Sequence, residues 1–214
     1  MGSNTMTQNS GKSVLASLEL LENGTQHAEF PERRQHNLGS SPERRQSGSL
    51  PDRRPHFQSG IAFSERIAGM LENSQMFKGF EWSQIETLSG YISLYRATPG
   101  AVLFREGDKG DFMCILLEGK LEIHKENIRH KDKTISTVLP GRSLGEMTIV
   151  DGEPRSATAV VVAPSVLAVL TQENFLILMR EKPALSAKLL LKIAQFLSQR
   201  LRLTSGILVD YLEQ

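Results

Sequence analysis

Three residues between positions 144 and 158 have the types and spacing needed to bind a sugar that carries a phosphate. Arg155 offers a planar fork of N–H donors that matches the oxygens of a phosphate. Glu146 accepts hydrogen bonds when it is ionised and can take one from a sugar hydroxyl. Gly145 opens a short apolar stretch, and backbone N–H groups at the start of a helix there would favour an anion. These residues predict an anion site with a hydroxyl-binding carboxylate beside it.

The residues around this segment have the regularly spaced turn signals that are typical of a small β-barrel. Across residues 91–170, turn-forming pairs recur at intervals of roughly 8–12 residues and bound runs rich in Val, Ile, Leu, Phe and Tyr. The pairs include Pro99-Gly100, Glu118-Gly119, Pro140-Gly141, Asp151-Gly152 and Pro164-Ser165. We therefore expect an α+β domain in which helices flank an antiparallel β jelly-roll barrel.

Helical patterns flank the predicted barrel on both sides. We expect the N-terminal helices of the domain over residues 61–90, where helical patterns run from Ser64 to Phe77 and from Glu81 to about Tyr91. Over residues 171–214, Thr171 is placed to cap a short helix and Pro183 to begin a long one. The long helix carries an apolar stripe wider than one barrel contact needs, so we expect part of it to pack against a second copy. The stripe comprises Leu185, Leu189, Ile193, Phe196, Leu197, Leu201, Leu208 and Leu212.

Residues 1–60 differ in composition from the rest of the chain. Residues 13–22 have helical periodicity and are followed by Asn23-Gly24, which predicts one short amphipathic helix. Residues 27–60 are rich in Pro, Ser, Gly and Arg, a composition typical of disorder. Three Arg-Arg repeats lie in this tail. They fit either a solvated linker or linear motifs that bind an acidic partner or an anion.

Residues 144–158 read Leu-Gly-Glu-Met-Thr-Ile-Val-Asp-Gly-Glu-Pro-Arg-Ser-Ala-Thr. They resemble the phosphate-binding cassette of the cyclic-nucleotide-binding domain family, which includes catabolite activator proteins and kinase regulatory subunits. The stretch from Phe104 to Asp111 resembles the family's first barrel hairpins. The resemblance implies that Arg155 binds a cyclic phosphate and Glu146 a ribose hydroxyl. The implied ligand-binding residues of the cassette are Gly145, Glu146, Met147, Arg155 and Ser156.

Further features of the resemblance bear on the nucleotide and on assembly. Thr204 and Ser205 resemble a pair that contacts adenine across the dimer in catabolite activator proteins. Thr204 would reach the base from its own subunit and Ser205 from the other. Ser156 stands where threonine is associated with cGMP. The resemblance thus implies a homodimer through the C-terminal helix that prefers cAMP, with cGMP as the second candidate. Thr148 departs from the alanine usual in kinase cassettes.

The sequence lacks the motifs of several other function classes. It contains no Walker loop, HExxH motif or Cys/His cluster, so we expect neither catalysis, a metal nor a cofactor. No helix-turn-helix follows the long helix, and we expect no direct DNA binding. A net charge of +1 and the lack of an 18-residue apolar run argue against a membrane and for a cytoplasmic protein. The lone Cys114 lies in an apolar run and should be buried.

Two functions remain open at this point. The first is a regulatory module that binds a cyclic nucleotide and signals by helix rearrangement to a partner protein. The alternative is an interaction or scaffold protein whose barrel does not bind nucleotide physiologically.

Overall fold

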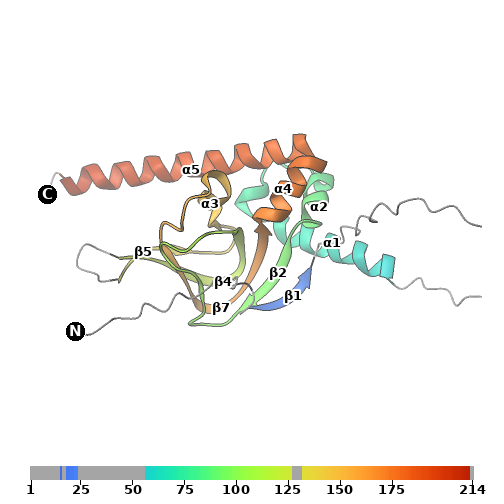
Figure 1. Ribbon diagram of the computed structural model, residues 1–214, viewed down its shortest axis with the longest axis horizontal. Coiled ribbons are helices and arrows are strands. Elements are labelled where there is room, and N and C mark those ends of the chain that lie inside the picture. The colour runs from blue at the N-terminus through green and yellow to red at the C-terminus, as the bar shows by residue number, and fades with distance from the viewer. Residues whose placement is uncertain (1–14, 16–17, 24–55, 127–131, 213–214) are drawn as a thin grey trace, which may run out of the picture.

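The computed structural model describes residue 15 and residues 18–23, 56–126 and 132–212, arranged as in Figure 1. The helices are α1 (His56–Glu72), α2 (Trp82–Ser89), α3 (Glu146–Asp151), α4 (Gln172–Glu181) and α5 (Pro183–Leu212), with a 3-10 turn, η2, at Gln75–Phe77. The strands are β1 (Glu19–Asn23), β2 (Ser93–Ala97), β3 (Val102–Phe104), β4 (Phe112–Glu126), β5 (Asp132–Val138), β6 (Ser143–Leu144) and β7 (Thr158–Thr171). The predicted antiparallel barrel with flanking helices is confirmed.

The strands form one seven-stranded antiparallel sheet in the order β1-β2-β7-β4-β5. Off this path β3 pairs with β7 and β6 pairs with β4, so the two longest strands each join several partners. The pairing of β4 with β7 shifts register between Leu116 and Leu121. Gly119 has a φ of +96°, and a Cβ there would lie 2.7 Å from the Cα of Ser165. This irregularity therefore needs a glycine, and it lets both strands bend around the barrel core.

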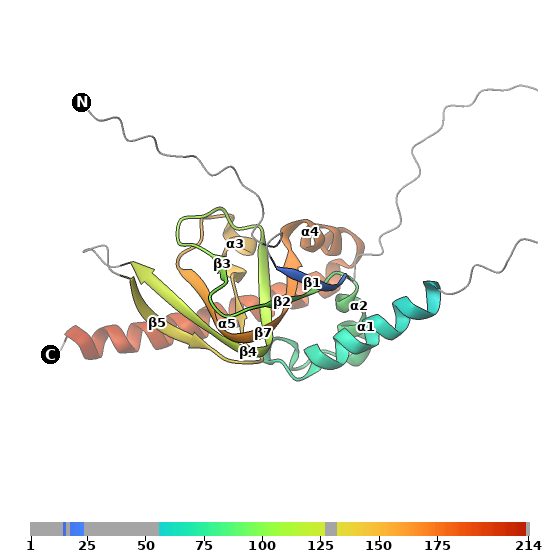
Figure 2. The ribbon, with the colours of Figure 1, turned by 90° about the horizontal axis from the view of Figure 1, so that it is seen from below.

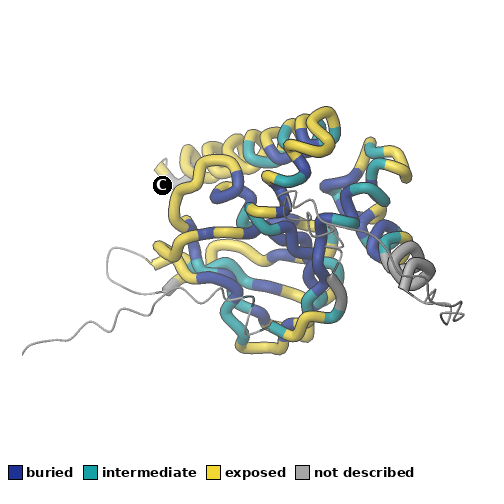
Figure 3. Tube along the Cα trace, turned by 45° about the vertical axis from the view of Figure 1, so that its right-hand side comes forward, coloured by how far each residue is buried: buried dark blue, intermediate teal, exposed yellow. Residues whose placement is uncertain are grey.

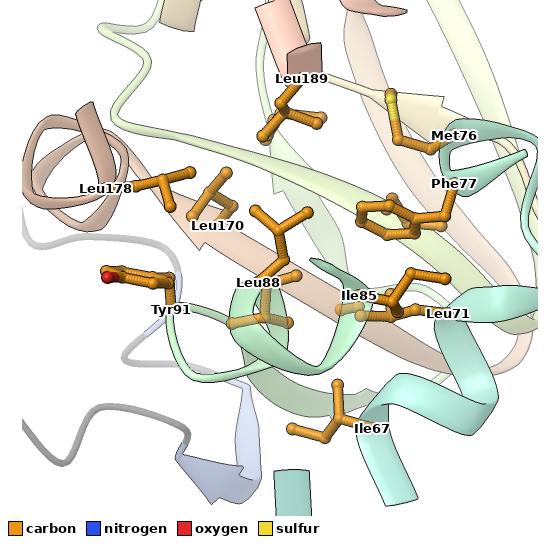
Figure 4. Close-up of a cluster of buried hydrophobic side chains, with 14 of the residues drawn as sticks. Ile67, Leu71, Met76, Phe77, Ile85, Leu88, Tyr91, Leu170, Leu178 and Leu189 are labelled. Atoms are coloured by element: carbon orange, nitrogen blue, oxygen red, sulfur yellow. The ribbon is translucent and has the colours of Figure 1, made fainter. Parts of the chain in front are cut away.

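Two apolar clusters hold the domain together. Leu103, Leu116 and Leu121 are completely buried inside the barrel. The second cluster joins the sheet to the helices and is drawn in Figure 4. It includes Ile67, Leu71, Ile85, Leu88, Leu178, Leu189 and Ile193. Each such side chain contributes roughly 1.5–3 kcal/mol on burial, so this cluster fixes the start of α5 against the barrel.

Cys114 belongs to the barrel cluster and is 1% exposed, as the sequence predicts. Burial raises the pKa of its thiol to about 12. The thiol is therefore protonated near neutral pH and packs as a small apolar group.

The connection from β7 to α5 follows the predicted capping pattern. The side chain of Thr171 accepts a hydrogen bond of 3.1 Å from the backbone N–H of Asn174 and so caps α4. α5 begins at Pro183, whose fixed φ suits the first turn of a helix. Both helix starts are confirmed.

α5 has two halves with different surroundings. Leu189 and Ile193 are buried against the helical cluster, whereas every residue from 198 to 209 is exposed. Figure 3 shows this change along the helix. The exposed apolar residues of the second half are Leu201, Leu203, Ile207, Leu208, Val209 and Leu212. Of the helices that the structure describes, α5 included, none is long and apolar enough to cross a membrane.

The predicted helix over residues 13–22 is wrong, because residues 19–23 form the strand β1. β1 pairs antiparallel with β2, and the side chains of Glu19 and Arg96 form an ion pair of 3.3 Å. Figure 2 shows β1 beside β2 at the edge of the sheet. A lone helix of about ten residues is marginal in water, whereas the edge of β2 offers backbone hydrogen-bond partners.

α1 begins at His56, inside the segment predicted as tail. The sequence predicts that the tail extends to Gly60, but one glycine costs a helix only about 1 kcal/mol relative to alanine. The Arg-Arg repeats lie outside the described residues.

Candidate functional site

Arg155 is buried between two aromatic rings. Its guanidinium carbon lies 4.2 Å from the ring centre of Phe104 and 4.6 Å from that of Phe112. The residue is 3% exposed. Burial lowers the pKa of Arg155, and nearby acidic groups, among them Asp111, oppose that shift. An arginine keeps its charge at neutral pH even so, which places a buried cation at the end of the cassette, residues 144–158.

Three hydrogen bonds orient this guanidinium. Nη1 donates to the carbonyl of Gly145 and to the hydroxyl of Thr148, both at 3.0 Å. Nη2 donates to the carbonyl of Phe112 at 2.7 Å. Nε of Arg155 is buried and has no partner within the described part of the chain. Leaving a buried donor unpaired costs about 1–3 kcal/mol, so the edge that carries Nε is the place for a ligand acceptor.

Gly145 makes room for this arrangement. Its φ is +76°, and it is the residue that precedes α3. A Cβ at this position would overlap Nη1 of Arg155 and lie 3.2 Å from the carbonyl oxygen of Phe112. Any other residue would be strained and would also push the guanidinium away. The glycine that opens the cassette is therefore required by the arginine near its end.

Glu146, the first residue of α3, is completely buried. Its Oε1 accepts a hydrogen bond from Nη1 of Arg200, and Nη2 of Arg200 donates to the carbonyl of Ser143 at 2.6 Å. Its Oε2 is buried without a partner among the described residues. A buried carboxylate needs a cation and hydrogen bonds, and here the cation comes from α5. Figure 1 shows how this happens, because α3 lies beneath the middle of α5.

Arg200 is a residue of the candidate site that the sequence does not single out. It lies 54 positions from Glu146 along the chain, and no local motif links the two residues. The spacing of Arg200 and Thr204 is the one sequence feature that could have indicated Arg200. The two residues are four positions apart, which puts both on one helix face.

The other predicted site residues fall into two groups. Met147 and Ser156 are exposed beside each other on the cassette, where the Ser156 hydroxyl lies 3.7 Å from the Met147 sulfur. Thr204 and Ser205 lie in the exposed half of α5, one helical turn beyond Arg200. The structure therefore brings the predicted cassette residues together and leaves the two hydroxyl residues of α5 exposed.

A second network fixes the cassette just after Arg155. Nζ of Lys125 donates to the carbonyl of Ser156 and to Oε1 of Glu106, both at 2.7 Å. Oε2 of Glu106 accepts from the backbone N–H of Glu126 at 3.2 Å. The hydrogen bond from Lys125 is the main cause that lowers the pKa of Glu106. The β4 strand thus holds the backbone of the last cassette residues in place.

Comparison with known proteins agrees with this geometry. Residues 95–182 match the family model described as "Cyclic nucleotide-binding domain". The chain is 28% identical over 132 residues to the cyclic AMP receptor protein of Thermus thermophilus, covering 62% of this chain and 59% of the relative. It is 26% identical over 110 residues to the cAMP-dependent protein kinase regulatory subunit of Blastocladiella emersonii, covering 51% of this chain and 27% of the relative.

A solved structure extends the similarity to the fold. The crystal structure of a cyclic nucleotide-binding domain from Methylobacillus flagellatus aligns with a TM-score of 0.62 and 29% identity. The alignment covers 70% of this chain and 84% of that one.

The barrel, its cassette and these similarities all point to one kind of domain, the cyclic nucleotide-binding domain. Residues 95–182 are similar to the cyclic nucleotide-binding domain family, and this matched segment includes the cassette and α4. The chain spans 59% of the length of the Thermus relative and 61% of that of a cAMP-activated regulator from Mycobacterium tuberculosis.

Proposed function

We propose that this domain binds a 3′,5′-cyclic nucleotide and prefers cAMP. The observation that carries the proposal is the pair of unpartnered buried atoms on the cassette, Nε of Arg155 and Oε2 of Glu146. The first is a cationic donor and the second an anionic acceptor, which suits a phosphate oxygen and a ribose hydroxyl of one ligand. The similarity to a cyclic AMP receptor protein and to cAMP-dependent kinase regulatory subunits supports adenine as the base.

The ligand would signal through α5. Glu146 offers one carboxylate oxygen to Arg200 and keeps the other free for the ribose. A ribose hydroxyl on the free oxygen would fix the orientation of the carboxylate and so favour one position of Arg200. Because a ligand shifts a conformational equilibrium only through its differential affinity, this shared carboxylate is the link that the switch requires.

The exposed half of α5 is the place for a second copy of the chain. Its apolar residues Leu201, Leu208 and Leu212 have no cover in the described residues, and a stripe of this size favours association. Thr204 and Ser205 lie on the same half, so two packed helices would present both hydroxyls near a base bound at the cassette. The signal would then pass to a partner protein, for which the Arg-Arg repeats are the candidate contact.

Calorimetric titration of the full chain with cAMP, cGMP and a cyclic dinucleotide tests the ligand. We expect a micromolar or lower Kd for cAMP and weaker binding of cGMP. No heat and no thermal shift with any of the three at millimolar concentration would overturn the proposal. That outcome would favour the alternative, a scaffold protein whose barrel binds no nucleotide.

Sedimentation tests the dimer separately from the ligand. Leu201→Asp should convert a dimer to a monomer, whereas Leu191→Asp, at an equally exposed position in the first half of α5, should leave the dimer intact. Replacing Thr204 and Ser205 by alanine should weaken cAMP binding by about 1 kcal/mol for each hydrogen bond lost and reduce discrimination between cAMP and cGMP. A monomer at tens of micromolar, with and without nucleotide, would exclude this assembly.

A further inference from the structure

The hydroxyl of Thr148 lies at the centre of the hydrogen bonds that orient Arg155. It donates to the carbonyl of Gly145 at 3.0 Å and accepts from Nη1 of Arg155 at 3.0 Å. Thr148 is 2% exposed, so water does not compete for these bonds. A threonine in a helix commonly bonds to a helix carbonyl, but here the hydroxyl also serves the arginine. Thr148 therefore ties the first turn of α3 directly to the guanidinium.

Gly110 shows that the fold is shaped around this threonine. A Cβ at Gly110 would lie 2.5–2.7 Å from the Oγ1, Cγ2 and Cβ atoms of Thr148, closer than real side chains approach. Unlike Gly107 and Gly145, Gly110 does not have a positive φ, so its backbone conformation does not call for a glycine. The side chain of Thr148 leaves no space for a Cβ at position 110, and this is why a glycine is needed there.

The bonds to Nη1 leave the guanidinium little freedom to turn. Nη1 carries two hydrogens, and Gly145 and Thr148 accept both of them. Nε is the buried donor that remains without a partner in the described residues. It shares one edge of the planar group with Nη2, and such an edge suits a phosphate. Without the Thr148 hydroxyl, one Nη1 hydrogen would be released and the group could turn to present a different edge.

We propose that Thr148 is a positioning residue that determines which exocyclic oxygen of the ligand phosphate Arg155 binds. The inference rests on the proposed function, because it concerns how the same site binds the phosphate of its ligand. It concerns the orientation of the cation rather than its presence, so it predicts an effect on selectivity between two forms of one ligand.

The test uses the two phosphorothioate diastereomers of cAMP, in which sulfur replaces one or the other exocyclic oxygen. In the full chain, Thr148→Val keeps the shape of the side chain and removes the hydroxyl, whereas Thr148→Ser keeps the hydroxyl. We expect Thr148→Val to bind cAMP roughly three- to tenfold more weakly and to move the affinity ratio of the diastereomers at least threefold towards unity. Thr148→Ser should keep both quantities within about twofold of wild type. An unchanged ratio in Thr148→Val, or an equal change in Thr148→Ser, would overturn the inference.

A readout without ligand separates this inference from the proposed function. In nitrogen-15 spectra of the free protein, the Nη1 hydrogens of Arg155 should exchange slowly in wild type and Thr148→Ser, and faster in Thr148→Val. Equal exchange in all three would show that the hydroxyl does not hold the guanidinium. Absence of nucleotide binding by wild type, in contrast, would overturn the proposed function and leave the exchange result standing.

Discussion

The two ends of the candidate site are held in opposite ways. Arg155 is fixed by the barrel and the cassette alone, between the rings of Phe104 and Phe112 and by three hydrogen bonds. Glu146 has a cation from a different element, the Arg200 side chain of α5, which is about half exposed. One end is thus organised before any ligand arrives, and the other is complete only when α5 lies over α3.

Under the proposed function, this difference would separate the affinity for the ligand from the signal that the ligand sends. A donor that is already oriented and shielded from water can bind a phosphate without reorganisation. We therefore expect most of the binding free energy to come from the Arg155 end. The Glu146 end contributes less to binding but depends on the position of a helix. Three substitutions test this division, in order of decreasing effect, and a fourth tests the network that holds the cassette.

Arg155→Ala should have the largest effect. Losing charge-assisted hydrogen bonds of about 1.5–3 kcal/mol each should weaken cAMP binding ten- to a hundredfold or more, as measured by titration calorimetry. Arg180→Ala, which removes an exposed arginine from α4, is the control and should bind normally. Circular dichroism should show that both variants are folded. Normal binding by Arg155→Ala would place the phosphate elsewhere.

Glu146→Ala should weaken binding less, by roughly tenfold. Because the inferred partner of Oε2 is the 2′-hydroxyl, this variant should also bind cAMP and 2′-deoxy-cAMP equally. The matched control is Glu153→Ala, an exposed glutamate of the same cassette, which should keep the preference for ribose. A preference retained in Glu146→Ala would remove the carboxylate from the sugar site.

Arg200→Met should alter signalling more than affinity. We expect a loss of affinity of about fivefold or less, because Oε2 stays available to the ribose. Hydrogen exchange along the exposed half of α5 should respond to cAMP in wild type and in the control Arg202→Met, and not in Arg200→Met. A normal response in Arg200→Met would mean that the signal reaches α5 by another contact.

Glu106→Gln should have the smallest effect and one that depends on pH. The folded protein lowers the pKa of Glu106 below its ordinary value of 4.5, so its ion pair with Lys125 stabilises the fold above that pH. Urea unfolding should find Glu106→Gln slightly less stable than wild type at pH 7. The difference in stability should disappear as the pH falls through the lowered pKa of Glu106, because the wild-type carboxylate then becomes protonated and neutral, as glutamine is. A gap that persists in acid would assign the loss to packing instead.

Local sequence patterns were sufficient for much of this fold. The cap at Thr171, the helix start at Pro183 and the glycine-bounded strands each depend on chemistry within a few residues. The cassette could also be predicted, because its residues lie within one short stretch of chain that resembles a known motif.

The features that the sequence did not reveal depend on distant partners. β1 forms because the edge of β2, some 70 residues further along, offers backbone hydrogen-bond partners. The apolar residues of β1 fit a helical pattern equally well when the segment is considered alone. Arg200 gains its role from a carboxylate that only the packing of α5 on α3 brings near. The same is true of Thr148, whose hydroxyl has a second use only beside a folded Arg155.

The length of α5 gives the Arg200 contact a mechanical consequence. With a rise of about 1.5 Å per residue, the segment from Arg200 to Leu212 is a stiff arm of about 18 Å. Tilting that arm by about 10° at Arg200 would carry its tip roughly 3 Å, about half the distance between neighbouring turns of a helix. A tilt of that size at the Arg200 contact would thus become a displacement large enough to change which side chains meet at the far end of α5.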